Sequence, residues 1–195
     1  MPPTARTTTA TAAPAADSAA APLAGTWDTA KGSVVGYRVK EVLFGQNHVA
    51  VGRTSAITGH ITISGTAVTA GTFTVPMATI TSDQSQRDNQ FRGRIMDTSA
   101  YPTATLTLAR PVALAPVPAP GVISTYTVTA DLILHEHTRT VTFPLSAERA
   151  SGEIEVSGSI PVLFADWDIP NPSFTGFVTT QNHGTLEFLL KLARS

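Results

Sequence analysis

The chain has 195 residues, with 13 Lys and Arg against 14 Asp and Glu, and no cysteine. This length fits one domain with a tail, and a formal net charge of −1 gives no positive field that could hold a nucleic-acid backbone. The lack of cysteine excludes disulfides, zinc–thiolate sites and a cysteine nucleophile. No apolar run approaches the roughly 20 residues of a membrane-spanning helix, so we expect no integral membrane span.

Residues 1–24 are almost entirely Ala, Thr and Pro. They carry too few large apolar groups to offset the entropy cost of ordering, so we expect a disordered linker that precedes one domain over residues 25–195. The segment lacks the charged start and apolar core of a signal peptide. Because linkers of this kind join a domain to an anchor or a signal, we expect an extracytoplasmic location and leave a cytoplasmic one open.

From Thr26 onward, short runs alternate apolar residues with Thr and Ser and are separated by Gly, Pro and Asn. A period of two with Val, Ile, Thr and Phe predicts β-strands. Short connections between such strands predict an antiparallel sandwich or a closed barrel, and the absence of strand–helix alternation argues against a parallel sheet. The eight predicted strands are residues 33–39, 57–65, 71–80, 104–110, 124–134, 140–147, 153–164 and 184–193.

Residues 82–102 break this alternation and predict one or two short helical turns that end before Tyr101. Asp83 with Gln86 three residues later is a plausible capping pair. Asp88 and Arg92 are four residues apart and could form an ion pair on one helix face. A long insertion between two strands is what a cap over a barrel mouth requires. Farther along, the stretch 182–184, Asn-His-Gly, predicts a β-turn between the last two strands.

The same insertion resembles the signature of the YceI-like family, the polyisoprenoid-binding proteins with a lipocalin-like barrel. Three other stretches, residues 33–41, 51–61 and 132–144, resemble the first strand, the Gly-rich second strand and a later hairpin of that family. The resemblance covers about Thr26 to Leu192. Within the insertion it rests on Arg87-Asp88, Phe91-Arg92, Asp97 and Tyr101-Pro102.

The resemblance implies an all-β fold, an extended eight-stranded antiparallel barrel with a short helical cap and a long apolar cavity. Such proteins bind isoprenoid or other long-chain lipids, and catalysis is not established for the family as a whole. We expect the more apolar face of the strands to point inward, together with two arginines of the cap. The residues predicted to bind the ligand are Val35, Tyr37, Val39, Glu41, Phe73, Val75, Met77, Arg87, Arg92, Leu106, Leu108, Leu132, Leu134, Phe143, Phe188 and Leu190.

Two charged features of this set have more than one interpretation. Arg87, Arg92 and Arg94 could hold an anionic head group, but the aspartates of the same segment favour ion pairs that fix the cap. Glu41 stands where the first strand of the family commonly has a histidine. It either lies near the cavity, where a carboxylate must be paired or neutral, or ends the strand in water.

The sequence "LHEHTRT" at 134–140 places His135 and His137 two residues apart, which is a metal-ligand spacing on a strand. The resemblance places a tight hairpin here, with a glycine at the position of Glu136. Inside a turn, residues two apart no longer share a face, so we favour an exposed turn and expect no bound metal. Glu136 indicates either a turn without positive φ or a strained one.

Three functions follow from these observations. The first is a binding protein that sequesters or carries a polyisoprenoid or fatty-acid type lipid, with no catalytic residue and no cofactor. The second is an enzyme that uses Glu41 and a histidine on a lipid in the same cavity. The third is a structural domain with a filled barrel. A homodimer is left open.

Overall fold

The computed structural model of the chain describes residues 23–173 and 177–195, so the predicted linker lies outside the described residues up to residue 22. The described part consists mostly of strands, with short helical segments η1 (Met77–Thr79), α1 (Ser85–Gln90), η2 (Phe91–Ile95, a π-helical turn) and η3 (Phe164–Trp167). The strands are β1 Gly25–Thr29, β2 Val34–Leu43, β3 Gln46–Thr54, β4 Thr58–Ser64, β5 Ala67–Pro76, β6 Thr103–Leu108, β7 Val112–Ala113, β8 Ser124–Leu134, β9 His137–Ala150, β10 Glu153–Leu163, β11 Val178–Thr180 and β12 His183–Arg194.

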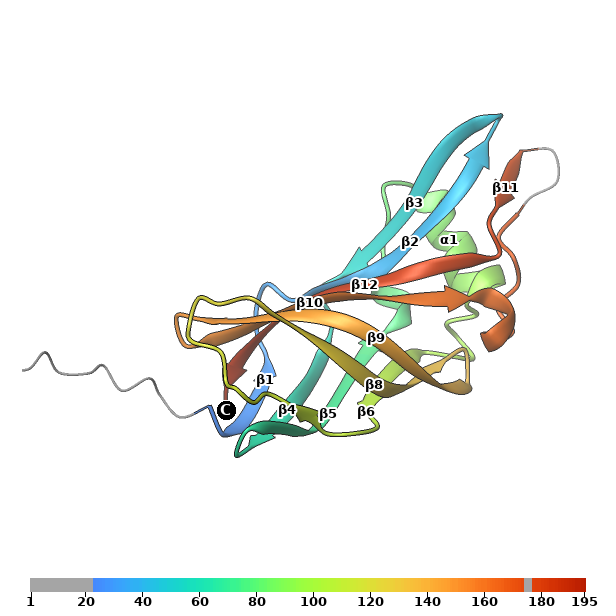
Figure 1. The fold of residues 1–195 in the computed structure, drawn as a ribbon. Helices are drawn as coiled ribbons and strands as arrows, with labels where there is room; N and C mark the ends of the chain where they lie inside the picture. The colour runs from blue at the N-terminus through green and yellow to red at the C-terminus, as the bar shows by residue number, and fades with distance from the viewer. Residues whose placement is uncertain (1–22, 174–176) are drawn as a thin grey trace, which may run out of the picture.

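Eight antiparallel strands of the described residues close into a barrel, which confirms the predicted fold class (Figure 1). The ring runs β1–β4–β5–β6–β8–β9–β10–β12 and closes where β12 pairs with β1, with Trp27 opposite Arg194 and Thr29 opposite Leu192. Closure leaves no unpaired edge within the ring. The alternating side chains of each strand therefore point either into the barrel or out to solvent.

One member of the ring differs from the prediction, because β1 takes the place expected for residues 33–39. Those residues belong to β2, which pairs with the other half of β12 and places Arg38 opposite Thr185. The step between β1 and β2 is bridged by the buried hydroxyl of Ser33, which accepts a hydrogen bond from the Lys191 amide at 3.0 Å and contacts the Lys191 carbonyl at 3.2 Å. Ser33 thus continues the hydrogen bonding of β12 between β1 and β2, and these two strands pair with the same edge of β12.

Strands β2 and β3 form a ribbon that rises beyond the ring, with β11 on the other edge of β2 (Figure 1). The base of the ribbon is tied to the barrel by paired backbone hydrogen bonds between Arg53 and Thr81, at 2.8 and 3.0 Å. Strands β11 and β12 follow the same edge of β2 in the same direction. The β-turn predicted at 182–184 is therefore wrong. The chain is interrupted there because the Asn182 carbonyl bonds to the amide of Phe164 in η3.

The cap between β5 and β6 consists of α1 and η2, as the prediction of short helical turns requires. The predicted capping pair is wrong, because the helix begins at Ser85 after Gln84 and has no side-chain cap. Asp83 instead forms an ion pair with Arg87. Asp88 accepts hydrogen bonds from the amide and hydroxyl of Ser82, at 2.8 and 2.7 Å, so this carboxylate fixes the loop before the helix and forms no pair with Arg92.

The interior of the barrel is apolar along its whole length. One cluster lies under the cap and includes Met77, Phe91 and Trp167. A second lies at the ring closure around Trp27 and Leu192, and Phe143 belongs to a third. Each fully buried aliphatic or aromatic side chain contributes about 1.5–3 kcal/mol to stability, so the inward faces of the strands account for most of the driving force for folding.

Candidate functional site

An apolar cavity of about 350 Å³ lies inside the barrel. At the ring-closure end it is lined by Leu23, Leu114 and Val117, and at the cap end it reaches Arg87 and Pro172. Between these ends nearly all of the lining side chains are aliphatic or aromatic. The volume falls in the range of small-molecule sites, and an apolar wall of this kind can exclude water from a slender apolar ligand.

Every residue of the predicted ligand-binding set except Arg92 lines this cavity. The strand phase places the set there, because the inward residues of β2, β5, β6, β8, β9 and β12 all converge on the barrel axis. Arg92 lies elsewhere: its guanidinium donates to the carbonyls of Ala78 at 2.9 Å and Ile80 at 3.4 Å. Arg94 is likewise used on the cap, where it donates to Gln90 Oε1 and to the Pro172 carbonyl.

Many lining residues were not in the predicted set: most lie on strands, such as Ile61 of β4 and Ile160 of β10, and the others lie in the cap and in loops. Phe91, Ile95 and Met96 close the cavity from the cap, while Val117 and Val122 line it from the loop before β8. The spacing of Phe91 and Ile95 marks a helical face, but it does not say what that face covers. The loop residues carry no periodic signal at all, so their contribution follows only from the way the loop crosses the barrel end.

Tyr37 is held in a fixed place in the cavity wall. Its ring stacks on Phe91 of the cap, with centroids 5.1 Å apart and planes inclined by 15°. On its other side lies Gly52, where an added Cβ would stand 2.3 Å from the Tyr37 ring, so only glycine admits the ring. Burial raises the pKa of the Tyr37 hydroxyl from 10.0 to about 12, and this phenol stays protonated at neutral pH.

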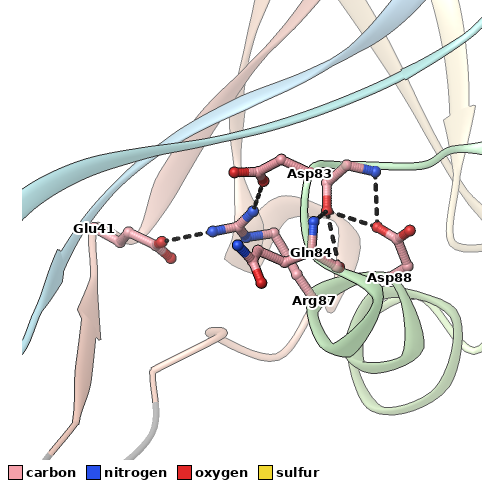
Figure 2. A network of polar contacts seen from close by, with 6 residues as sticks. Glu41, Asp83, Gln84, Arg87 and Asp88 are labelled. Carbon is pink, nitrogen blue, oxygen red and sulfur yellow. Dashed lines mark hydrogen bonds and ion pairs between the residues drawn. The ribbon is translucent and has the colours of Figure 1, made fainter.

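A polar network joins the cap to β2 at this end of the cavity (Figure 2). Arg87 lies between two carboxylates: Glu41 of β2, with an Nη2–Oε1 distance of 3.3 Å, and Asp83. The Glu41 side chain is 11% exposed and lines the cavity, so the structure favours the cavity over the strand end in water. Arg87 is tied to both carboxylates, which favours an ion pair that fixes the cap over a free anion-binding group.

The histidine pair of the sequence lies in the hairpin between β8 and β9. His135 and Glu136 form its two-residue turn, with φ of 50° and 66°. The turn is therefore the strained alternative, with two residues in a conformation that favours glycine. The His135 Nδ1 lies 3.0 Å from the Trp167 carbonyl, and the described residues contain no group of three or more His, Asp or Glu side chains that could hold a metal ion.

Comparison with known proteins identifies a family for this fold and cavity. The family model described as the YceI-like domain matches residues 26–192. A polyisoprenoid-binding domain from Saccharophagus degradans, implicated in plant cell wall breakdown, is similar with a TM-score of 0.72 and 19% identity; the match covers 88% of this chain and 99% of that one. BcnA of Burkholderia cenocepacia is similar with a TM-score of 0.61 and 19% identity, over 80% of this chain and 95% of its own.

The YceI protein of Campylobacter jejuni matches 72% of this chain and 83% of its own, with a TM-score of 0.54 and 11% identity. No curated protein matches the chain. Among the helices of the described residues, none is long and apolar enough to cross a membrane. At these identities the solved structures establish the fold of the barrel.

Proposed function

Because the chain belongs to the YceI-like family, we propose that it binds a long-chain apolar lipid of the isoprenoid or fatty type inside its barrel, and that it sequesters or carries that lipid. The observation that carries the proposal is the cavity: one apolar space runs along the barrel from the ring closure to the cap. The likeness to a polyisoprenoid-binding domain supports the isoprenoid class.

The physical basis of binding is burial of the chain of the lipid. Each methylene that leaves water for an apolar wall gains about 0.8 kcal/mol, so a few isoprene units suffice for micromolar affinity without any covalent chemistry. The wall is preformed by packed strands, which limits the entropy lost on binding. Such a cavity favours a binding protein over an enzyme.

The alternative of an enzyme that uses Glu41 and a histidine has less support. Glu41 is held by Arg87, and His135 does not line the cavity but packs against Tyr101, with ring centroids 4.2 Å apart. The extracytoplasmic location and the linker role of residues 1–24 remain predictions, and a homodimer is left open.

Mass spectrometry of organic extracts from the purified protein tests the proposal directly. We expect a co-purifying lipid with a long apolar chain, present in the native protein and reduced in a variant with a charge inside the barrel, such as Val75→Asp. Native protein that contains no lipid and takes up no isoprenoid or fatty-chain compound would argue for a structural domain instead.

A further inference from the structure

The cap end of the cavity combines a carboxylate, a guanidinium and a phenol in its wall, and Tyr126, Glu148 and Arg149 supply the same three groups elsewhere in the lining. Glu41, Arg87 and Tyr37 all line the cavity there, and they come from β2 and α1. A lipid with its chain along the barrel would place its head group against these residues or at the other end. The chemistry of the three groups determines which head group they can accept.

The guanidinium of Arg87 is already engaged by two carboxylates, Glu41 and Asp83 (Figure 2). A third carboxylate, Asp88, is buried on the same helix and bonded to Ser82. Two carboxylates therefore contact one guanidinium and a third lies on the same helix, and the formal net charge of these four groups is −2. A phosphate or carboxylate head would have to compete with Glu41 and Asp83 for Arg87 while it lies beside these like charges, which disfavours an anionic head.

An uncharged head group that forms hydrogen bonds is not repelled by these carboxylates. The Tyr37 hydroxyl has no hydrogen-bond partner among the described residues, although its ring is fixed between Gly52 and Phe91. The Oε2 atom of Glu41 likewise has no partner in the described part of the chain, because Arg87 contacts only Oε1. One fixed phenol and one carboxylate oxygen can together accept from and donate to a single hydroxyl.

The electrostatics at the phenol agree with this geometry. Burial is the main cause of the raised pKa of Tyr37, which Arg87 opposes while Asp88, Glu41 and Asp83 add to the rise. The phenol therefore remains a neutral hydrogen-bond donor.

We propose that the cavity selects a long-chain lipid whose head group is an uncharged hydroxyl, bound by Tyr37 and Glu41, and that it discriminates against phosphate and carboxylate heads. This inference rests on the proposed lipid-binding function and names the ligand class of the same site. Arg87 acts here as a positioning residue that holds Glu41 and closes the cap.

Three compounds with the same fifteen-carbon isoprenoid chain test the proposal: farnesol, farnesoic acid and farnesyl phosphate. Each is titrated against protein that holds N-phenyl-1-naphthylamine, an apolar fluorescent probe without charge, below the micellar concentration of the lipid. We expect farnesol to displace the probe at a concentration about tenfold or more below that of either anion. Equal or tighter binding of an anion, or displacement by none of the three, overturns the proposal.

Single substitutions test which residues determine the selectivity for the head group. Tyr37→Phe should weaken the binding of farnesol roughly five- to tenfold relative to that of the probe, whereas Tyr101→Phe, outside the cavity, should not change this ratio. Glu41→Gln should reduce the ratio of the affinities for farnesol and farnesyl phosphate severalfold. Glu155→Gln, on the outer face, should leave this ratio unchanged. If Tyr37→Phe and Glu41→Gln both behave like the native protein, the head group does not lie at the cap.

The two proposals fail in different ways. Native protein that binds neither the probe nor any farnesyl compound contradicts lipid binding itself. Protein that binds the probe and ranks the three head groups in another order contradicts only the selectivity.

Discussion

Val75 and Thr74 are adjacent residues of β5 on opposite faces of the barrel wall, and Val75 lines the cavity. We predict that Val75→Asp abolishes binding of a fluorescent isoprenoid probe and lowers stability, because a buried carboxylate without a partner costs several kcal/mol. Thr74→Asp places the same charge on the outer face and should change probe binding little. Fluorescence titration and urea unfolding measure the two effects. Equal probe binding by the two variants would show that the ligand lies elsewhere.

Glu136 occupies a left-handed conformation with φ of 66°, in a turn where such a conformation favours glycine. We predict that Glu136→Gly raises Tm by roughly 2–4 °C, since the loss of Cβ strain outweighs the added flexibility of the unfolded chain. Thermal unfolding followed by circular dichroism measures the change. Glu136→Ala removes the carboxylate but keeps Cβ, and should give no gain. A gain of the same size in the alanine variant would assign the effect to charge.

At the scale of elements, Glu187 of β12 joins the ribbon to the ring through Arg38 of β2 and Arg53 of β3. The hydrogen bond from Arg38 holds the pKa of Glu187 below its ordinary value of 4.5. A carboxylate with a lowered pKa stabilises the fold above its ordinary pKa, and that contribution is lost as the pH falls through the lowered value. Glu187→Gln should therefore lower Tm by a few degrees at pH 7 and by much less at pH 3.

Thermal unfolding of the native protein and the Glu187→Gln variant at both pH values checks this prediction. Glu155→Gln, which loses only a longer contact of 3.8 Å to Lys191, serves as the matched control. A difference between native protein and Glu187→Gln that stays the same from pH 7 to pH 3 would mean that ionisation of Glu187 does not stabilise the ribbon.

The strands that the sequence predicts well are those whose inward face is continuously apolar, such as β8 and β12. There the period of two correctly places Leu132, Leu134, Phe188 and Leu190 on the cavity wall, although the predicted set omits Val128 and Leu192 of the same faces. Strand β1 has only five residues and β3 begins with exposed polar residues, so neither carries a clear alternation. Their places depend on partners far along the chain: β1 closes the ring against β12, and β3 pairs with β2 alone over most of its length. A local sequence pattern cannot predict which distant strand each of them pairs with.

The charged residues of the candidate site show the same limit. The sequence identifies Glu41 as unusual and Arg87 as a candidate, but pairing between β2 and α1 depends on how the cap folds over the ribbon. Arg92 lies on the same segment as Arg87, yet its guanidinium donates hydrogen bonds to backbone carbonyls and does not reach the cavity. Which arginine reaches the cavity is decided by the start of the helix, and the predicted capping pair misplaced that start.

At the scale of the whole molecule, the boundary between linker and barrel lies inside the predicted linker. The Leu23 carbonyl accepts a hydrogen bond from Trp27 Nε1 at 2.9 Å, and Leu23 packs against the cluster at the ring closure. The Ala24 carbonyl accepts from Arg194 at 2.6 Å. We predict that deletion of residues 1–22 leaves Tm unchanged, whereas deletion of residues 1–24 lowers it by several degrees because Trp27 loses its partner.

Differential scanning calorimetry of the two truncated proteins beside the full chain measures this difference. The shorter deletion is the control for the longer one, since the two differ only in Leu23 and Ala24. A clear loss of stability on removal of residues 1–22 would contradict the linker prediction, and equal Tm for both truncations would show that Leu23 contributes nothing.

The closing pair of the ring, β1 with β12, has a consequence for synthesis of the chain. These are the first and last described strands, so β1 and β10 each present an open edge until β12 emerges from the ribosome. Contacts between residues as distant as Trp27 and Arg194 form late and slowly, because a long loop must close before they contribute. During translation the apolar inner wall is exposed to water and to other nascent chains, and the barrel depends on protection from aggregation until its last strand is in place.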